Sequence, residues 1–454
     1  MRFGHRVKGK IESYDDKGRG IFNIAEPETQ QTGSGTFAIP FTAVGDEVTA
    51  TFIKRDHGTK ISRLETLDAP GPDRVKAPCP HAGTCGGCLW QHLSYDAQAK
   101  IKLGMINKSF EELGHAERIT SVIPAKEHLK QRNRMDYCVG WNGEIGLKEY
   151  GSWNRYVDLK TCLIMNDGIG EILQEVREWM KAHDLSPWDA KFYRGEIRYV
   201  VVRDGKRTDQ RMITVVIHSF ESIKEDARAD LSARLKNSCT SLLLGEQSLT
   251  TDLSLAQKFE PLFGNEYIEE VVNDVRYQIH PNSFFQTNTV MAEELQTIVG
   301  RLLFDGTKSS HLLDLYCGLG FFGVAFARQH PELKVSGFEI DAHAIELAKY
   351  NSNINGVGER CDFFAGPAED LSWKDIKADT VILDPPRAGL HPKVLKTVLE
   401  MAPPTIVYVS CNYHRLVHEL TQFKEKYTVE KLEAIDMFPH TPHVEVVAKL
   451  VKKN

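Results

Sequence analysis

Hydrophobic and polar residues alternate in short runs over residues 1–66. Alternation with a period of two predicts strands that bury one face, and turns containing glycine or aspartate separate the runs. The five runs are VKGKIESY, GIFNIAE, GTFAIPF, DEVTATFIKR and KISRLETL. Short strands with frequent turns predict a small OB-like β-barrel in this part of the chain.

The segment APGPD at residues 69–73 interrupts this pattern. Two prolines around a glycine continue neither a strand nor a helix, so we expect a linker here. Residues 67–270 then mix strand-like runs such as IRYVVVR with helical runs such as GIGEILQEVREWMKAHD. This mixture predicts an α+β middle domain.

Strand-like and helical runs alternate regularly over residues 271–454. The order HLLDLYCG, FFGVAFARQH, KVSGFEI, DAHAIELAKYNSNIN, DTVILDPP, HPKVLKTVLEM, TIVYVSC shows the alternation. This order predicts a doubly wound, Rossmann-like parallel sheet in the C-terminal domain, so the fold class is α/β.

Composition and charge narrow the possible functions. The chain has 454 residues and a net charge of −6, so no overall positive field attracts nucleic acid, and RNA contacts require local basic patches. No apolar run approaches the roughly 20 residues that span a bilayer, and the first residues lack a signal peptide pattern. We therefore expect neither membrane insertion nor secretion. Nine cysteines, three of them close together, favour a reducing cytoplasm and a metal site.

A glycine turn follows the apolar strand Leu312–Leu315, and a helical run follows the turn. Such turns bind nucleotide cofactors but also occur without a ligand, so this loop alone is a weak sign. Glu339 ends the next strand about 20 residues on, where a carboxylate binds a ribose diol, while Asp341 is the expected N-cap of the following helix. Asp384 ends a third strand. Because the loop lacks the full G-x-G-x-x-G, we expect S-adenosylmethionine rather than NAD.

Cys411 ends a fourth buried strand and is predicted to lie at the same sheet edge as Asp384. A cysteine at a strand end is usually an inert small hydrophobe. At this edge, however, a thiolate suits addition to carbon 6 of a pyrimidine, which activates carbon 5 towards methylation. The methylated adduct must lose a proton, and Glu445 is the candidate base, although a solvated strand residue is an equal alternative. His440 and His443 flank a proline, and we expect loop packing rather than a metal pair.

Several motifs together resemble the RNA 5-methyluridine methyltransferases over nearly the whole chain. They are Cys79-x5-Cys85-Gly-Gly-Cys88 with Gln91-His92, Phe285-Gln286-Thr287-Asn288, Asp384-Pro-Pro-Arg387-Ala-Gly389, Ser410-Cys411-Asn412 and Asp436-Met437-Phe438-Pro439-His440-Thr441. The resemblance is strongest to the branch that joins an N-terminal TRAM barrel to an iron–sulfur centre and usually modifies 23S ribosomal RNA. It implies a TRAM barrel at 1–66, a central domain at 67–270 and a methyltransferase domain at 271–454.

The same resemblance implies roles for individual residues. Cys411 would be the nucleophile and Glu445 the proton acceptor. Contacts to S-adenosylmethionine are implied for Gln286, Tyr316, Glu339 and Asp384. One position departs from the pattern: ribosomal members often have asparagine after the second loop glycine, where this chain has Phe321. That substitution puts one cofactor hydrogen bond in doubt.

The clustered cysteines Cys79, Cys85 and Cys88 suit either zinc or an iron–sulfur cluster, and their spacing does not choose between the two. A fourth ligand is needed. The resemblance selects Cys162 from the middle domain and implies a 4Fe–4S cluster. The other cysteines are expected to be packing residues, namely Cys138, Cys239, Cys317 and Cys361.

A uracil within folded RNA must leave its stack to reach Cys411, so we expect a basic groove around the site. One basic stretch contains Lys8, Lys10, Lys17 and Arg19, and a second contains Lys126, Lys130, Arg132 and Arg134. A solvated charged face is the commoner explanation of an isolated run. The second stretch is the better candidate for binding RNA, since its family counterpart lies in the RNA cleft.

The combined prediction is a cytoplasmic enzyme that methylates carbon 5 of a uridine in structured RNA, with 23S ribosomal RNA as the expected substrate and no obligate protein partner. Three alternatives remain. The first is the same chemistry on the T-loop uridine of transfer RNA. The second is amino-group methylation of a base, which leaves Cys411 and Glu445 without a role. The third is a redox or RNA-binding module, which leaves the cofactor loop unexplained.

Overall fold

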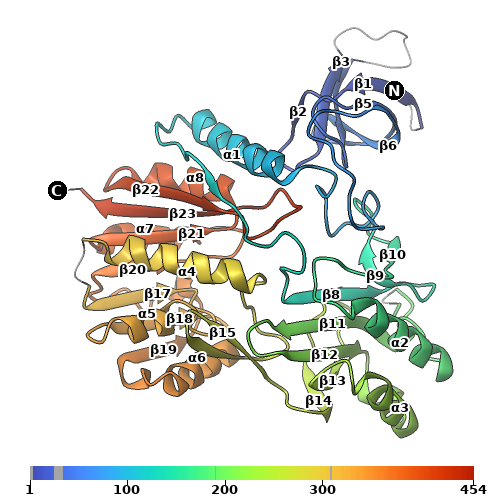
Figure 1. The fold of residues 1–454 in the computed structure, drawn as a ribbon. Helices are drawn as coiled ribbons and strands as arrows, with labels where there is room; N and C mark the ends of the chain where they lie inside the picture. The colour runs from blue at the N-terminus through green and yellow to red at the C-terminus, as the bar shows by residue number, and fades with distance from the viewer. Residues whose placement is uncertain (1–3, 25–33, 190, 307–308, 454) are drawn as a thin grey trace. The chain divides into compact units, whose positions relative to one another are not determined.

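The computed structural model describes residues 4–24, 34–189, 191–306 and 309–453. Its two compact units interleave along the chain (Figure 1). The first unit contains Met1–Met105, Lys148–Val157 and Phe438–His443, and the second contains Ile106–Leu147, Asp158–Met437 and Val444–Asn454. Within the described ranges, no helix is long and apolar enough to cross a membrane.

The first unit holds a six-stranded sheet in the order β1-β5-β6-β4-β3-β2. Its strands are β1 (Arg6–Lys10), β2 (Ser13–Tyr14), β3 (Gly20–Ile24), β4 (Gly35–Ile39), β5 (Glu47–Asp56) and β6 (Thr59–Ala69). Buried Phe22, Phe37 and Val48 belong to its core. Five strands were predicted, but the first run divides because β1 pairs with β5 whereas β2 pairs with β3. The last two residues of the second run, 25 and 26, lie outside the described residues.

The predicted linker is fixed to this sheet. The backbone N–H of Gly71 donates to the Asp46 carboxylate at 2.7 Å, and the Arg74 guanidinium bonds the same carboxylate at 2.5 Å. A Cβ at position 71 would lie 2.2 Å from the carbonyl oxygen of Val44, so only glycine fits there. Helix α1 (Tyr95–Glu112) follows.

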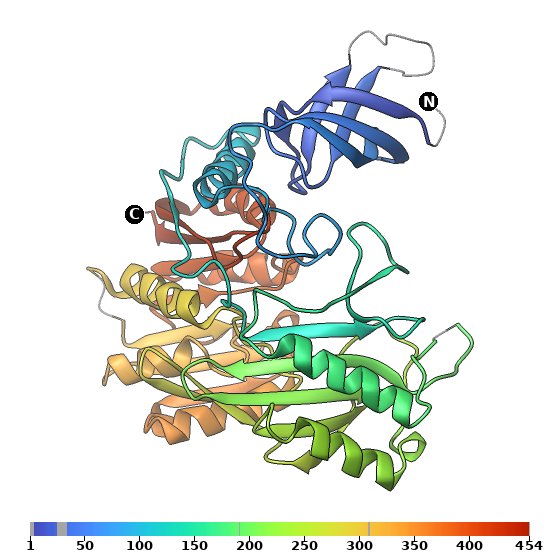
Figure 2. The same cartoon turned by 45° about the vertical axis from the view of Figure 1, so that its right-hand side comes forward.

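Most residues of the two large sheets belong to the second unit, while Lys148 and residues 156–157 of the central sheet belong to the first. The central one has the order β10-β9-β8-β11-β12-β13-β14. Its strands are β8 (Arg134–Val139), β9 (Ile145–Lys148), β10 (Tyr156–Asp158), β11 (Ile197–Gly205), β12 (Gln210–Ile217), β13 (Ser241–Glu246) and β14 (Lys258–Phe263). Helices α2 (Ile169–Ala182) and α3 (Glu225–Leu235) lie next to each other in both views (Figure 1, Figure 2), joined by a hydrogen bond from the Trp179 indole to the Ala227 carbonyl.

The other sheet has the order β19-β18-β17-β20-β21-β23-β22-β7. Its strands are β7 (Val122–Ile123), β17 (His311–Leu315), β18 (Lys334–Glu339), β19 (Cys361–Ala365), β20 (Thr380–Leu383), β21 (Thr405–Ser410), β22 (Tyr427–Ile435) and β23 (Glu445–Lys452). Between them come the helices α4 (Thr289–Phe304), α5 (Gly323–Gln329), α6 (Ala342–Ile354), α7 (Pro392–Met401) and α8 (Tyr413–Phe423). Strands β15 (Ile268–Val272) and β16 (Val275–Ile279) form a separate pair.

The predicted parallel sheet is therefore present. The pairs from β19 to β21 are all parallel, and β23 is antiparallel to β21. Strand order reverses between β17 and β20, and ligands bind open α/β sheets at the carboxyl ends of the strands beside such a reversal. Unexpectedly, β7 comes from the segment assigned to the middle domain and pairs with β22.

Candidate active site

Four of the residues assigned from the sequence follow or end parallel strands at one sheet edge. Tyr316 follows β17, Glu339 ends β18, Asp384 follows β20 and Cys411 follows β21. Strand β23 runs the opposite way, so its first residue, Glu445, lies at the same edge. The pairing of Ser410 with Val446 places Cys411 and Glu445 opposite each other there.

The glycine turn after β17 is held by backbone hydrogen bonds and open on one side. The N–H groups of Tyr316 and Cys317 both donate to the carbonyl of Phe338, at 2.9 and 3.0 Å. Tyr316 has a φ of 67°, and Gly318 has a φ of 54°. A Cβ at Gly318 would meet nothing within 4 Å, so its backbone faces open space that a cofactor can occupy.

Glu339 lies directly beside this turn. One of its carboxylate oxygens accepts the N–H of Gly318 at 3.2 Å, and the other accepts the N–H of Asp341 at 3.1 Å. Each oxygen retains a lone pair that suits a ribose hydroxyl. The Asp341 side chain accepts the N–H of His343 and caps α6, as predicted.

A buried carboxyl group that the sequence analysis did not assign lies under the turn. Asp314 in β17 is fully buried, one of its oxygens accepts the N–H of Gly323 at 3.1 Å, and the other has no hydrogen-bond partner. Burial, followed by repulsion from Asp384, raises the pKa of Asp314 to about 8. Burial also raises the pKa of Asp384. Buried carboxyl groups of this kind are stabilised by a cation, and S-adenosylmethionine carries both a sulfonium and an ammonium group. The residues present thus fit this cofactor.

Cys411 is half-buried, and its surroundings determine its ionisation. Burial, together with the negative charges of Glu445 and Asp384, raises the pKa of the thiol to about 11. The guanidinium of Arg387 opposes this shift through its charge and a hydrogen bond to the sulfur. Arg387 is therefore placed to stabilise a thiolate. The Asp-Pro-Pro-Arg motif contains this arginine, but the sequence alone did not connect it with the thiol.

The neighbours of Cys411 in the chain fix the loop that carries Arg387. The side-chain amide of Asn412 donates to the Arg387 carbonyl at 2.9 Å, and its oxygen caps α8. The Ser410 hydroxyl accepts the N–H of Asn412 at 3.2 Å. Buried Glu419 accepts the N–H of Leu390 at 3.0 Å, further along the same loop. This last contact could not be predicted from the sequence, because it depends on a helix residue eight positions beyond the thiol.

Glu445 is 3% exposed. Burial first, and then the negative charge of Asp384, raise its pKa well above the usual value, while Arg387 opposes the shift. The solvated strand residue considered from the sequence is therefore wrong, because this carboxyl group is buried among charged groups.

The loop of Gln286 is held to neighbouring elements. Asn133 donates its side-chain amide to the Gln286 carbonyl at 2.8 Å, and Asn288 donates to the Met437 carbonyl at 3.2 Å. Phe321 is buried, and its carbonyl accepts from the Tyr277 hydroxyl at 2.7 Å. The aromatic ring at position 321 therefore has a packing role in this chain.

The three basic residues expected to touch RNA differ in their surroundings. Lys130 forms an exposed ion pair with Asp167 at 2.5 Å. Arg134 is largely buried and bonds Asp136 and the Pro281 carbonyl, so its guanidinium is already engaged. The backbone N–H of Arg132 donates to the Ile164 carbonyl at 2.8 Å. Of the other basic stretch, Arg19 is buried and pairs with Asp15.

The clustered cysteines lie in the first unit, and Cys162 lies in the second. Among the residues that the structure describes, no group of three or more histidine, cysteine, aspartate or glutamate side chains is placed to hold a metal ion. Cys317 and Cys361 are buried, in keeping with packing roles, and Cys138 and Cys239 are half-buried.

Comparison with known proteins identifies the family. The tRNA (Uracil-5-)-methyltransferase family matches residues 206–453. A tRNA (uracil(54)-C(5))-methyltransferase of Pyrococcus horikoshii is 36% identical over 98% of this chain and 100% of its own length. A 23S rRNA (uracil(747)-C(5))-methyltransferase of the same organism is 31% identical over 98% of this chain and 100% of its own length.

A solved structure is similar to this chain in both sequence and fold. The crystal structure of Pyrococcus abyssi tRNA (uracil-54, C5)-methyltransferase in complex with S-adenosyl-L-homocysteine is 32% identical. It aligns with a TM-score of 0.81 over 98% of this chain and 99% of its own. The mixed α/β methyltransferase fold expected from the sequence is thereby confirmed. The chain is an enzyme that belongs to the tRNA (uracil-5-)-methyltransferase family.

Proposed function

We propose that this enzyme transfers a methyl group from S-adenosylmethionine to carbon 5 of a uridine in RNA, through a covalent bond between Cys411 and the uracil. The observation that carries the proposal is the position of Cys411 and Glu445 opposite each other at the edge where the glycine turn lies. A thiol and a buried carboxyl group, adjacent to a cofactor site, are the two groups that this chemistry requires.

The reaction would proceed by addition of sulfur to the uracil, methyl transfer and loss of a proton. The Cys411 thiolate bonds to carbon 6 of the uracil, and the electron pair of the carbon 5–carbon 6 double bond moves towards carbon 5. When bound, S-adenosylmethionine would supply the methyl group: carbon 5 bonds to the methyl carbon, the bond between that carbon and the sulfonium sulfur breaks, and its electron pair stays on the sulfur. Glu445 accepts the proton of carbon 5, the double bond re-forms, and the bond between carbon 6 and sulfur breaks. Arg387 stabilises the thiolate at the first and last of these steps.

Four residues are proposed to hold the cofactor. Glu339 would bind the ribose hydroxyls, because its carboxylate lies beside the open face of Gly318. Asp384 would face the charged end of the molecule, and Tyr316 and Gln286 would line the site. Asp314 would favour the positively charged cofactor without contacting it, because a nearby cation stabilises its buried carboxyl group.

The T-loop uridine of transfer RNA is our first candidate substrate. A 23S ribosomal uridine was expected first from the sequence, but the relative with 36% identity is named for uridine 54 of tRNA, whereas the ribosomal relative has 31% identity. The ribosomal substrate remains the second candidate. Incubating the enzyme with each unmodified RNA and mapping 5-methyluridine by mass spectrometry tests the choice. Methylation of ribosomal RNA alone would contradict our order.

The N-terminal TRAM barrel and the three-domain division remain proposals, supported by the six-stranded sheet of the first unit. Arg132 and Lys130 remain proposed RNA contacts, while Arg134 is proposed only as a residue that shapes the loop, since its guanidinium is engaged. We place the enzyme in the cytoplasm, where its RNA substrates would be found.

The iron–sulfur cluster is a proposal supported only by the spacing of Cys79, Cys85, Cys88 and Cys162 and by the resemblance. Protein purified without oxygen should then be brown and contain about four iron atoms per chain, the number in one 4Fe–4S cluster. The broad visible absorption should vanish in Cys85→Ser. Colourless protein, or protein with stoichiometric zinc, would contradict the assignment.

A further inference from the structure

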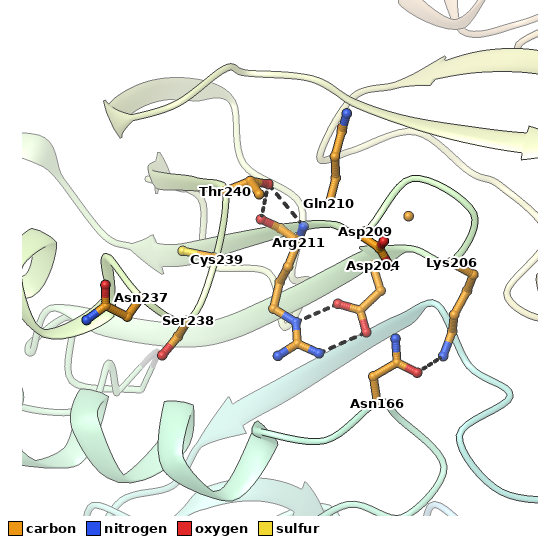
Figure 3. A pocket seen from close by; sticks show the side chains of 11 residues that line it. Asn166, Asp204, Lys206, Asp209, Gln210, Arg211, Asn237, Ser238, Cys239 and Thr240 are labelled. Atoms are coloured by element: carbon orange, nitrogen blue, oxygen red, sulfur yellow. Dashed lines mark hydrogen bonds and ion pairs between the residues drawn. The ribbon is translucent and has the colours of Figure 1, made fainter.

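A polar pocket with a volume of about 360 Å³ lies at one end of the central sheet (Figure 3). Its walls come from the turn between β11 and β12, from residues 237–240 before β13, and from Asn166. None of the residues assigned above to methyl transfer lines it. Its size suits one small polar ligand or one unit of a polymer.

One of the two cations in the pocket is fixed by a buried acid. Arg211 donates to both oxygens of the Asp204 carboxylate, at 2.6 and 3.1 Å, and Asp204 is 4% exposed. A third guanidinium N–H donates to the Asp167 carbonyl at 3.0 Å. These bonds use three of the five donors of the arginine and hold its plane in position. Figure 3 shows the two bonds to Asp204.

The other cation, Lys206, donates its side-chain hydrogen bonds to neutral oxygens. Its ammonium group donates to the Lys130 carbonyl and to the side-chain oxygen of Asn166, both at 2.5 Å. In the described part of the chain, no acidic side chain forms an ion pair with it. Burial lowers the pKa of Lys206, with Asp204 among the groups that oppose the shift. A partly buried cation whose side-chain hydrogen bonds go to neutral oxygens is favourably placed to receive an anion.

The acidic residues of the pocket do not prevent an anion from binding to Lys206. The Asp204 charge is compensated by Arg211. Asp209, in the turn, is exposed at the rim with a φ of 53°. Asn237 is likewise exposed. Their oxygens offer acceptors to hydroxyl groups next to an anion, as a ribose 2′-hydroxyl would be.

The basic stretch connects this pocket with the candidate active site. Lys130 accepts the bond from Lys206, and Asn133, three residues on, bonds the carbonyl of Gln286 at 2.8 Å. Three residues of extended chain span at most about 11 Å. An RNA strand with its target base near Gln286 would therefore have backbone close to the pocket.

We propose that this pocket binds one ribose-phosphate unit of the substrate RNA, with the phosphate on Lys206 and Arg211 and the ribose at the rim. This inference rests on the proposed function, because it takes RNA as the substrate. It deepens that function by assigning a backbone subsite separate from the pocket for the reacting base.

The test is the salt dependence of RNA binding by Lys206→Gln. Each lost phosphate contact lowers the slope of log Kd against log salt concentration by about 0.7 to 0.9. We expect that decrease for Lys206→Gln, no decrease for Lys206→Arg, which keeps the charge, and none for Lys181→Gln, an exposed lysine of α2 outside the pocket. A purely structural role of Lys206 would lower the melting temperature and the affinity but leave the slope unchanged, and this result would overturn the proposal.

A second measurement covers the case in which Lys206→Gln fails to fold. Acetylation of lysines in the unaltered enzyme, with and without unmodified tRNA, should show Lys206 protected by RNA and Lys181 equally reactive in both. Equal reactivity of Lys206 would refute the subsite. If the same enzyme preparation still forms 5-methyluridine, only the subsite fails. If it methylates no RNA at carbon 5, the proposed function fails.

Discussion

Cys411 and Glu445 lie opposite each other at one edge of the sheet, because Ser410 pairs with Val446 across the antiparallel strands β21 and β23. One strand ends one residue before the thiol, and the other begins at the carboxyl group. The negative charge of Glu445 contributes to the raised pKa of Cys411, which shows that the two groups influence each other. A register shift of one residue would turn Glu445 to the other face of the sheet.

The reactivity of Cys411 should depend steeply on pH. The thiolate is the reactive form, and its pKa is raised to about 11, so alkylation by iodoacetamide should accelerate about tenfold for each pH unit between about pH 7 and pH 10. Arg387→Ala should move this profile to higher pH, because a positive charge is lost. Glu445→Gln should move it to lower pH. Peptide mass spectrometry identifies the modified cysteine, and a flat profile at Cys411 would be inconsistent with the raised pKa.

Replacing Glu445 by glutamine should separate the two halves of the reaction. The amide cannot accept the carbon 5 proton, so a methylated protein–RNA adduct should accumulate and survive a denaturing gel. Cys411→Ala serves as the control, since it should bind RNA without forming any adduct. If Glu445→Gln releases methylated RNA at the normal rate, another group is the base.

Loss of the proton from Asp314 should lower the free energy of unfolding as pH rises. Its pKa is about 8 in the folded protein and 3.8 when unperturbed, so the folded state holds a proton that the unfolded state has lost between these values. This contribution is complete below about pH 4 and disappears as pH rises through about 8. Asp314→Asn should therefore raise the melting temperature of the cofactor-free protein more at pH 8 than at pH 5. It should also weaken binding of S-adenosylmethionine, measured by calorimetry. A stability difference independent of pH would contradict the assignment.

Asn412 should matter for both stability and activity. Asn412→Ala removes a helix cap and the hydrogen bond to the Arg387 carbonyl, which together cost about 1 to 2 kcal/mol. Ser219→Ala is a matched control, because Ser219 also caps a helical turn but lies far along the chain from the motifs. We expect reduced methyl transfer only in Asn412→Ala. Equal activity of the two variants would show that the Arg387 loop needs no support from Asn412.

The parallel sheet could be predicted because its strands are largely apolar and helices separate them at regular intervals. The same order placed Glu339, Asp384 and Cys411 at strand ends, which is where the structure has them. Strand β7 could not be predicted, since two residues carry no periodic signal and its partner β22 lies more than 300 residues away in the chain. Division of the first run into β1 and β2 likewise depends on which neighbour each half pairs with.

The chemical environment of the site was harder to predict than its location. Asp314 lies in an apolar strand, and that polar residue in LLDLY was the available signal. The contact between Arg387 and Cys411 joins two loops through folding alone. Burial excluded a solvated position for Glu445. The ion pair with Asp136 showed that the guanidinium of Arg134 is engaged within the protein. Sequence spacing reports which residues are present, whereas pKa values and ion pairs depend on neighbours that only the fold supplies.

The most direct test of the account is the site of attachment of an RNA that contains 5-fluorouridine. Fluorine cannot leave carbon 5 as a cation, so the methylated adduct should remain bound to the enzyme. Digestion of the trapped complex and mass spectrometry should find the nucleotide on the peptide that contains Cys411, with one added methyl group. Absence of any covalent complex with an RNA that the enzyme otherwise methylates, or attachment at a different residue, would contradict the covalent role of Cys411.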